Sequence, residues 1–150
     1  MISWEASLTI SRAKIATLQP ATQVKVKAWF NACLDAGLRP YIYEGLRTSA
    51  RQTELFAIGR TKQKSRPVVT NAKAGQSMHQ YALAIDFGPL VAVKGKAAEM
   101  FEIDWSDKAY KPYHALAVKH GLRRLSWETP HLEDASYANW QAAAKVIKSA

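Results

Sequence analysis

Hydrophobic positions recur at helical spacing in the first half of the chain. In residues 20–37 apolar side chains lie three or four positions apart, and Pro20 suits the first turn of a helix. Residues 48–59 carry the end signals of a helix, with Ser49 and Gln52 placed as a capping box and Gly59 as the stop. Both stretches are therefore predicted to be helices.

Two stretches of the second half also predict helices. Residues 110–121 carry one apolar face, and we expect this helix to start near Pro112 because a proline deeper in a helix would break it. Residues 136–149 predict a closing helix, whose apolar face holds Trp140, Ala143, Ala144 and Ile147.

Three other stretches have the character of β-strands. Residues 39–45 alternate like a strand, and residues 81–87 form a short apolar run bounded by a Gly-Pro pair. Residues 122–133 predict extended chain, whereas residues 60–76 predict a loop. Helices mixed with a few non-adjacent strands favour an α+β fold over repeated βαβ units.

Composition adds that this is one ordinary globular domain. The chain has 150 residues, of which 48% are hydrophobic and 22% charged, and no repeat or linker divides residues 1–150. Cys33 is the one cysteine, which excludes an internal disulfide and a four-cysteine metal site, and its place on an apolar helix face predicts a buried thiol. We find no apolar run that could span a membrane and no secretory signal, so we expect synthesis in a reducing cytoplasm.

Charge is concentrated in the first half of the chain. The net charge is +9, and residues 60–73 contain five basic residues and no acidic ones. Such a segment suits an anionic partner, either nucleic acid or a bacterial envelope. It equally fits a solvated basic loop, and charge alone does not choose between them.

The four histidines fall into two groups. His114 and His120 lie six residues apart in one predicted helix, so they do not share a face, and we interpret both as structural or surface residues. His79 and His131 instead occupy loop or strand positions with acidic residues close by in the sequence.

These acidic residues suggest a metal site. Catalytic zinc commonly takes three protein ligands, and His79, Asp86 and His131 would supply them. Hydrolysis also needs a base that is not a ligand, and Glu128, three residues before His131, is a candidate, with Glu133 a second acidic neighbour. The alternative is that Asp86 merely ends a strand. Each spacing is weak by itself.

Three motifs resemble one known family. The stretch "SMHQYALAID", residues 77–86, is similar to the S-x-H-x-x-G-x-A-x-D signature of peptidoglycan-cleaving zinc peptidases related to D-Ala-D-Ala carboxypeptidases and dipeptidases. "ETPH", residues 128–131, falls where that family has an acidic base three residues before its last metal ligand. "GLRTSARQTELFAIGRT", residues 45–61, resembles the segment that supplies an active-site arginine and a glutamine. The small size and missing signal are most similar to phage endolysins that are L-alanyl-D-glutamate endopeptidases.

The resemblance implies a fold and a site. It implies an α+β fold with a small, mostly antiparallel sheet, flanking helices and a zinc site on the sheet face. Its implied residues are His79, Asp86 and His131 as zinc ligands, Glu128 as general base and acid, Arg47 for the carbonyl oxygen, Ser77 for substrate binding, and Gln52 for substrate binding or support of Arg47. Arg47 and Gln52 also fit as caps of the second helix, and Ser77 fits an ordinary turn.

Three features depart from the family pattern. Ala82 stands where the signature usually has glycine, and Glu128 stands where phage members often have aspartate. The stretch between Gly121 and Trp127 is short and lacks the glycine- and tryptophan-rich sequence expected there. These departures bear more on the substrate than on the metal.

The expected partner is peptidoglycan, cut in its stem peptide at the L-Ala–D-Glu bond, after release of a monomeric enzyme to the cell wall in the periplasm. The basic residues 60–73 would add attraction to the anionic envelope, and we expect no nucleic acid or membrane span. One alternative is a D-Ala-D-Ala carboxypeptidase or dipeptidase. Others are a non-catalytic basic module that binds envelope or nucleic acid, and a scaffold that binds metal without hydrolysis.

Overall fold

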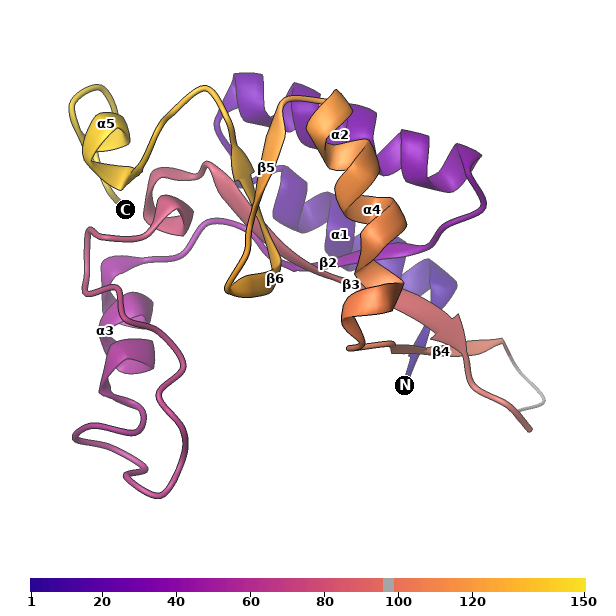
Figure 1. Cartoon of the computed structure of the whole chain (residues 1–150), viewed down its shortest axis with the longest axis horizontal. Coiled ribbons are helices and arrows are strands. Elements are labelled where there is room, and N and C mark those ends of the chain that lie inside the picture. Colours follow the sequence, from indigo (N-terminus) through magenta and orange to yellow (C-terminus); the bar gives the residue numbers. More distant parts are fainter. Residues whose placement is uncertain (96–98) are drawn as a thin grey trace.

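The computed structural model describes residues 1–95 and 99–150, which form one sheet with helices packed around it (Figure 1). The elements, in chain order, are β1 (Ile2–Ser3), α1 (Trp4–Ile15), α2 (Pro20–Asp35), β2 (Pro40–Glu44), α3 (Ser49–Ala57), the 3-10 helix η1 (Met78–Tyr81), β3 (Ala84–Ala92), β4 (Met100–Ile103), α4 (Asp107–Lys119), β5 (Leu122–Leu125), β6 (Glu128–Asp134) and α5 (Trp140–Ala144).

The sheet is antiparallel and is organised around β3. Its strand order is β1-β4-β3-β6-β5, and β2 pairs with β3 outside this path. Every pairing between the strands named above is antiparallel. The α+β fold with an antiparallel sheet and flanking helices is thus confirmed. Because β3 pairs with β2, β4 and β6, side chains at its ends lie beside residues from distant parts of the chain.

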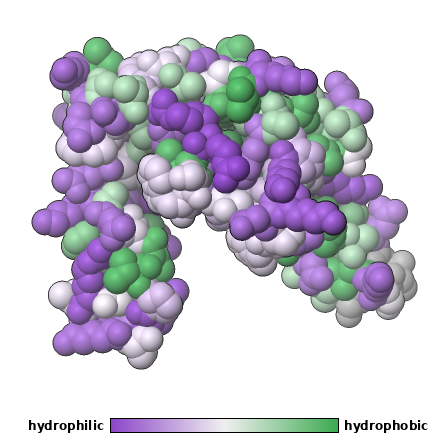
Figure 2. Space-filling view, in the orientation of Figure 1, coloured by the Kyte–Doolittle hydropathy of each residue, from purple (hydrophilic) through white to green (hydrophobic). Residues whose placement is uncertain are grey.

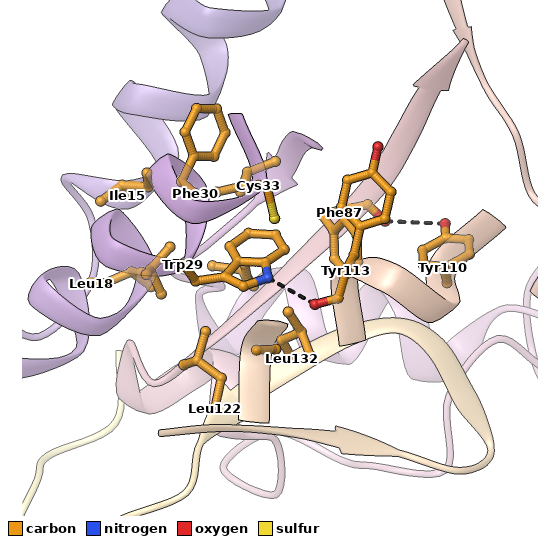
Figure 3. Close-up of a cluster of buried hydrophobic side chains, with 14 residues drawn as sticks. Ile15, Leu18, Trp29, Phe30, Cys33, Phe87, Tyr110, Tyr113, Leu122 and Leu132 are labelled. Carbon is orange, nitrogen blue, oxygen red and sulfur yellow. Dashed lines mark hydrogen bonds between the residues drawn. The ribbon is translucent and has the colours of Figure 1, made fainter. Parts of the chain in front are cut away.

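The main core lies between the sheet and the helices α2 and α4 (Figure 3). Trp29 is fully buried, packs edge-to-face on Phe87 with ring centroids 5.0 Å apart, and donates its indole N–H to the Tyr113 carbonyl at 3.0 Å. Cys33 lies in the same core, where burial raises the pKa of its thiol to about 12. A thiol with so high a pKa is a poor nucleophile, in agreement with the interpretation of Cys33 as structural.

The predicted start of α4 is wrong. The helix begins at Asp107, not near Pro112, and Ser106 caps it by accepting the Ala109 N–H at 3.3 Å. Pro112 lies just beyond the first turn, whose N–H groups have no partner inside a helix. The proline therefore removes a single intrahelical hydrogen bond, and the burial of Tyr110, Tyr113 and Ala117 in the main core holds the helix together around it.

Helix α3 is also capped differently from the prediction. The capping residue is Thr48, whose hydroxyl accepts the Arg51 N–H at 3.2 Å, and the Ser49 hydroxyl instead donates to the Ala150 carbonyl at 2.6 Å. A Thr–x–x–Arg pattern gives only half of a capping box, since arginine cannot accept the N–H of the cap. The capping role considered for Gln52 is thereby excluded.

Strand β3 continues through the Gly-Pro pair that was expected to end it. Pro89 stands opposite Pro40 in the pairing with β2, and its carbonyl accepts the Asp104 N–H at 2.9 Å, so the strand continues although proline has no N–H of its own. A Cβ on Gly88 would lie 2.5 Å from Ile103 Cγ2, so glycine allows the β4 side chain to lie across the strand. The pair thus suits the sheet instead of ending it.

The ends of the chain differ most from the sequence pattern. The predicted closing helix over residues 136–149 is regular only in α5, although Trp140, Ala143 and Ile147 do pack on one cluster, with Met78 and other residues beside η1. Helix α1 and strand β4 were not foreseen. No helix in the described part of the chain is long and apolar enough to cross a membrane.

Candidate active site

Three side chains from separate segments meet at the centre of the sheet. Asp86 is in β3, His131 is its register partner in β6, and His79 is in η1, which leads into β3. Asp86 Oδ1 lies 3.2 Å from His79 Nε2 and 3.5 Å from His131 Nδ1. All three atoms lie within 4.8 Å of one another. The structure thus brings together the three predicted metal ligands.

The spacing of these atoms fits a tetrahedral metal ion. Ligand atoms bound to zinc at about 2.0–2.1 Å in a tetrahedron lie about 3.3 Å from each other. The two distances from Asp86 Oδ1 agree with this value. Among the described residues, His131 Nδ1 is also a buried side-chain nitrogen without a hydrogen-bond partner, which is costly unless a ligand takes its lone pair. The residues therefore fit a metal.

Both imidazoles are oriented through their second nitrogen. His79 Nδ1 lies 2.9 Å from the Gly45 carbonyl oxygen, and His131 Nε2 lies 2.8 Å from Glu133 Oε1. Because each oxygen can only accept, each of these nitrogens carries the proton in the neutral ring, and the other nitrogen presents its lone pair towards Asp86. Glu133 is held in turn by Arg123, whose Nη2 lies 2.5 Å from Glu133 Oε2.

Electrostatics at the site favour a positive ion between the side chains. Burial alone would raise the pKa of Asp86, but the two imidazoles outweigh it and hold that pKa well below its ordinary value. Burial alone would lower the pKa of His131, but its bonds to Asp86 and Glu133 raise it to about 9. Because the pKa of His131 is raised, a metal ion competes with a proton for Nδ1.

Ala82, at the position where the signature has glycine, adopts a backbone conformation that favours glycine. It ends η1 in the left-handed conformation, with φ of 58°, and its N–H bonds to the His79 carbonyl at 3.3 Å. A non-glycine residue there costs about 1–2 kcal/mol. Glycine at this position, as in the family signature, would adopt the same conformation without this strain. In the present chain the strained Ala82 closes η1, which holds His79 in place.

Arg47 lies beside the metal ligands and is held on several sides. Its Nε and Nη2 donate to the two carboxylate oxygens of Glu44 at 2.7 and 2.8 Å, and its Nη1 donates to Gln52 Oε1 at 2.9 Å. Nη2 also lies 3.4 Å from Asp86 Oδ2. Gln52 is fully buried and donates to the Ala72 carbonyl at 2.6 Å, so it supports Arg47 from behind.

A cleft of about 1020 Å³ opens beside the metal ligands. One wall comes from residues 68–72, in the loop before η1, and the other from residues 123–128, in the β5–β6 hairpin. Figure 2 shows the molecule hollowed between the limb that carries α3 and the rest of the domain. A peptide in this cleft would run past the metal ligands.

The remaining predicted site residues line this cleft. Glu128 Oε2 lies 3.9 Å from His131 Nδ1, and its side chain is 46% exposed, so the carboxylate is next to the metal ligands without being one of them. Ser77 lines the cleft, and its hydroxyl accepts the His79 N–H at 3.3 Å. Ser77 therefore caps η1, and whether it also binds substrate stays a prediction.

Comparison with known proteins identifies the family. A family model described as "VanY: D-alanyl-D-alanine carboxypeptidase" matches residues 15–141. The chain belongs to the VanY family. A curated relative, the peptidoglycan L-alanyl-D-glutamate endopeptidase CwlK of Bacillus subtilis (strain 168), is 40% identical over 70 residues, which are 47% of this chain and 41% of CwlK. The match thus spans less than half of that relative.

Solved structures show that the VanY-family fold extends over most of the chain. A vancomycin resistance D,D-pentapeptidase VanY, a mutant in complex with Zn(II), has a TM-score of 0.58 and 19% identity, covering 86% of this chain and 77% of its own. The L-Ala D-Glu endopeptidase ChiX of Serratia marcescens has a TM-score of 0.56 and 17% identity, covering 83% and 85%. At these identities the likeness establishes the fold alone.

Two acidic residues of this VanY-family site had no assigned role in the sequence. Glu133 stands two residues after His131 on one strand, so the period of a strand already puts both on one face, and this could have revealed the pair. Glu44 had no such signal. It reaches the site because β2 pairs with β3 and places Glu44 opposite Asp86.

The Glu133→Gln substitution is expected to weaken zinc binding by about 10- to 100-fold. A carboxylate can only accept the His131 Nε2–H, whereas the glutamine amide can also turn its NH2 group towards the ring and leave the imidazole misoriented. Competition with a chromogenic chelator measures this affinity. The exposed Glu102, in β4, provides a control that removes the same charge away from the site. Equal affinities in Glu133→Gln and wild type would show that Glu133 does not orient the imidazole.

Proposed function

We propose that this chain is a zinc-dependent peptidase that hydrolyses a bond in the stem peptide of bacterial peptidoglycan. The observation that carries the proposal is the convergence of His79, Asp86 and His131, with an unpaired nitrogen, beside the exposed carboxylate of Glu128. Membership of the VanY family and the name of the relative CwlK support the substrate class.

Glu128 is placed to move protons in such a reaction. When bound, zinc lowers the pKa of a water molecule and polarises the carbonyl to be attacked. Glu128 would take the proton of that water and pass it to the leaving amine, a role that needs a carboxylate near the metal but not bound to it. Pro130 stiffens the strand between Glu128 and His131 and limits drift of the base.

Arg47 would stabilise the carbonyl oxygen as it becomes negative. Burial alone would lower its pKa, but Glu44 outweighs this and raises it, so the guanidinium stays charged. Its contacts with Glu44 and Gln52 fix the planar fork before substrate arrives. Charge held in place beforehand is what makes such a group effective in a transition state.

For the bond that is cut, we propose L-Ala–D-Glu, with an endolysin of phage type as the biological setting and the cell wall as the site of action. The 40% identity to CwlK and the motif resemblance support this choice. D-Ala-D-Ala carboxypeptidase activity is the second candidate, since the matching family model bears that description.

Chelation is expected to abolish lysis of purified sacculi, and added zinc to restore it, because the site has no other source of a strong electrophile. Turbidity reports lysis, and mass spectrometry of the released muropeptides identifies the bond. New amino-terminal D-Glu supports the endopeptidase, whereas loss of a single D-Ala supports the carboxypeptidase. Full lysis with the metal removed would refute the proposed function.

The basic loop after α3 offers a separate prediction about the envelope. Lys62, Lys64 and Arg66 are exposed in the loop that follows α3. This loop and α3 project from the rest of the domain in Figure 1. Replacing all three by glutamine is expected to lower kcat/KM on sacculi by about 3- to 10-fold at low ionic strength, because positive charge concentrates the enzyme at an anionic surface. The difference should vanish at high salt.

A matched control removes three charges elsewhere. Lys108, Lys111 and Lys119 are exposed along α4, so their joint replacement by glutamine changes the net charge equally. If kcat/KM falls equally in both triple variants, the total charge of the protein causes the effect and the position of the basic loop does not matter. If neither loses rate at any salt concentration, the attraction plays no part.

A further inference from the structure

A row of aromatic side chains lies beside the active site and has no role in the chemistry above. It consists of Tyr41 and Tyr43, from β2, and Trp105, from the segment between β4 and α4. The ring centroids of Tyr41 and Tyr43 are 6.0 Å apart, and those of Tyr43 and Trp105 are 6.2 Å apart. Trp105 is 61% exposed. Tyr41 and Tyr43 are half-buried beside it. A single exposed aromatic residue is common, but three aromatic rings in contact make a larger continuous surface. We call these three residues the aromatic stripe.

The aromatic stripe begins at the metal ligands. Tyr43 precedes Glu44, which stands opposite Asp86 in the pairing of β2 with β3. Burial raises the pKa of Tyr43, and the nearby carboxylates of Asp86, Glu44 and Glu128 raise it further. A molecule that lies on the stripe would therefore extend to the site of cleavage.

The stripe tyrosines, which are half-buried, differ from the three buried tyrosines Tyr81, Tyr110 and Tyr113. The hydroxyls of Tyr81 and Tyr110 donate to backbone carbonyls, and that of Tyr113 accepts a backbone N–H. Within residues 1–95 and 99–150, the hydroxyls of Tyr41 and Tyr43 make no hydrogen bond to protein. Buried tyrosines usually find a partner, so these two hydroxyls are left to solvent or to a ligand.

Trp105 is held out by an ordered backbone. On its amino-terminal side, the Asp104 N–H donates to the Pro89 carbonyl at 2.9 Å. Asp104 Oδ1 also accepts the Ser106 N–H at 3.0 Å, and Ser106 caps α4. A large side chain kept exposed on a fixed backbone loses little entropy when a ligand packs on it.

We infer that the aromatic stripe binds the amino-sugar rings of the glycan strand while the stem peptide lies in the metal cleft. The inference rests on the proposed function, and it adds a glycan subsite to it. The faces of a sugar ring present C–H groups, which pack well on the negative faces of aromatic rings. Its hydroxyl and acetamido groups would bond to the free hydroxyls of Tyr41 and Tyr43.

This subsite bears on which bond is cut. In peptidoglycan the stem peptide joins the sugar through its L-Ala residue, so the L-Ala–D-Glu bond is the nearest to the glycan and the D-Ala–D-Ala bond is the farthest. Because Tyr43 precedes Glu44, the register partner of Asp86, glycan on the stripe would bring the first bond of the stem towards the metal ligands. The aromatic stripe thereby favours the endopeptidase.

Binding can be tested without catalysis. Titration with peptide-free N-acetylglucosamine tetramer is expected to shift the indole N–H signal of Trp105 in the NMR spectrum and not that of buried Trp29. The signal is assigned with Trp105→Phe, and Trp105→Ala is expected to bind the tetramer at least about fivefold more weakly. No shift at millimolar tetramer would overturn the inference, whether or not the chain is a peptidase.

Steady-state kinetics provide a second test of the glycan subsite. The ratio of kcat/KM for a glycan-linked muropeptide to that for the free stem peptide of the same sequence is expected to fall about tenfold in Trp105→Ala. Val118, which is exposed on α4, gives a control substitution, Val118→Ala, that leaves the ratio unchanged. An unchanged ratio in Trp105→Ala would refute the glycan subsite. A wild-type chain that cleaves neither substrate would instead refute the proposed function, and the NMR titration would still decide on the stripe.

Discussion

The Glu128→Gln substitution is expected to lower kcat on sacculi by about 100- to 10,000-fold while one equivalent of zinc still binds. Glutamine keeps the size of the side chain but cannot take a proton. The Glu128 carboxylate is 46% exposed and lies 3.9 Å from His131 Nδ1, so its loss removes none of the three proposed ligands. Initial rates of lysis, together with the metal content of the purified protein, give the measurement.

Glu54 supplies the control for this experiment. It is exposed on α3 and pairs with Arg51 at 3.2 Å, so Glu54→Gln removes the same charge outside the cleft and should keep the wild-type rate. A Glu128→Gln protein that lyses sacculi normally would refute the role as base. One that loses its zinc along with its activity would show that Glu128 is a ligand.

The second large effect is expected at Arg47. Arg47→Lys should lower kcat by about 100- to 1,000-fold with a small change in KM, because the charge would then be stabilising the transition state more than the bound substrate. Lysine retains the charge but cannot bond to both oxygens of Glu44 and to Gln52 at once. Steady-state kinetics on a soluble muropeptide would separate kcat from KM.

Arg51→Lys is the matched control, since Arg51 is exposed on α3 and its guanidinium pairs with the exposed Glu54. Its rate should equal that of wild type. If Arg47→Lys raises KM and spares kcat, then Arg47 binds a carboxylate of the substrate instead of the developing oxyanion. Thermal unfolding of both variants shows whether Arg47→Lys has disturbed the packing around Gln52.

Local sequence signals predicted the regular parts of the fold well. Helix α2, strand β2 and the extended segment of β5 and β6 lie where hydrophobic spacing placed them. The errors arose where tertiary contacts outweighed a local rule. Pro112 is tolerated within α4, and the Gly-Pro pair continues β3, because packing and strand pairing supply what the backbone lacks. Periodicity cannot reveal such compensation.

For the candidate site, too, local motifs predicted one part and tertiary contacts determined the other. The residue types and spacing of His79, Asp86 and His131, read with the family motifs, were enough to name a metal site and a base. Ala82, which stands where the family signature has glycine, adopts a left-handed conformation in the structure. Such features are local, since a motif of a few residues specifies its own backbone and donor atoms.

What the tertiary structure decided is which groups surround those residues. Glu44 and Asp86 are far apart in the chain, as are Trp105 and Tyr43, and only the pairing of β2, β3 and β4 brings them together. Strand register is set by the burial of a whole face, so it depends on the entire core at once. For that reason the chain alone named the metal ligands, and the fold determined the support of Arg47 and the aromatic surface beside it.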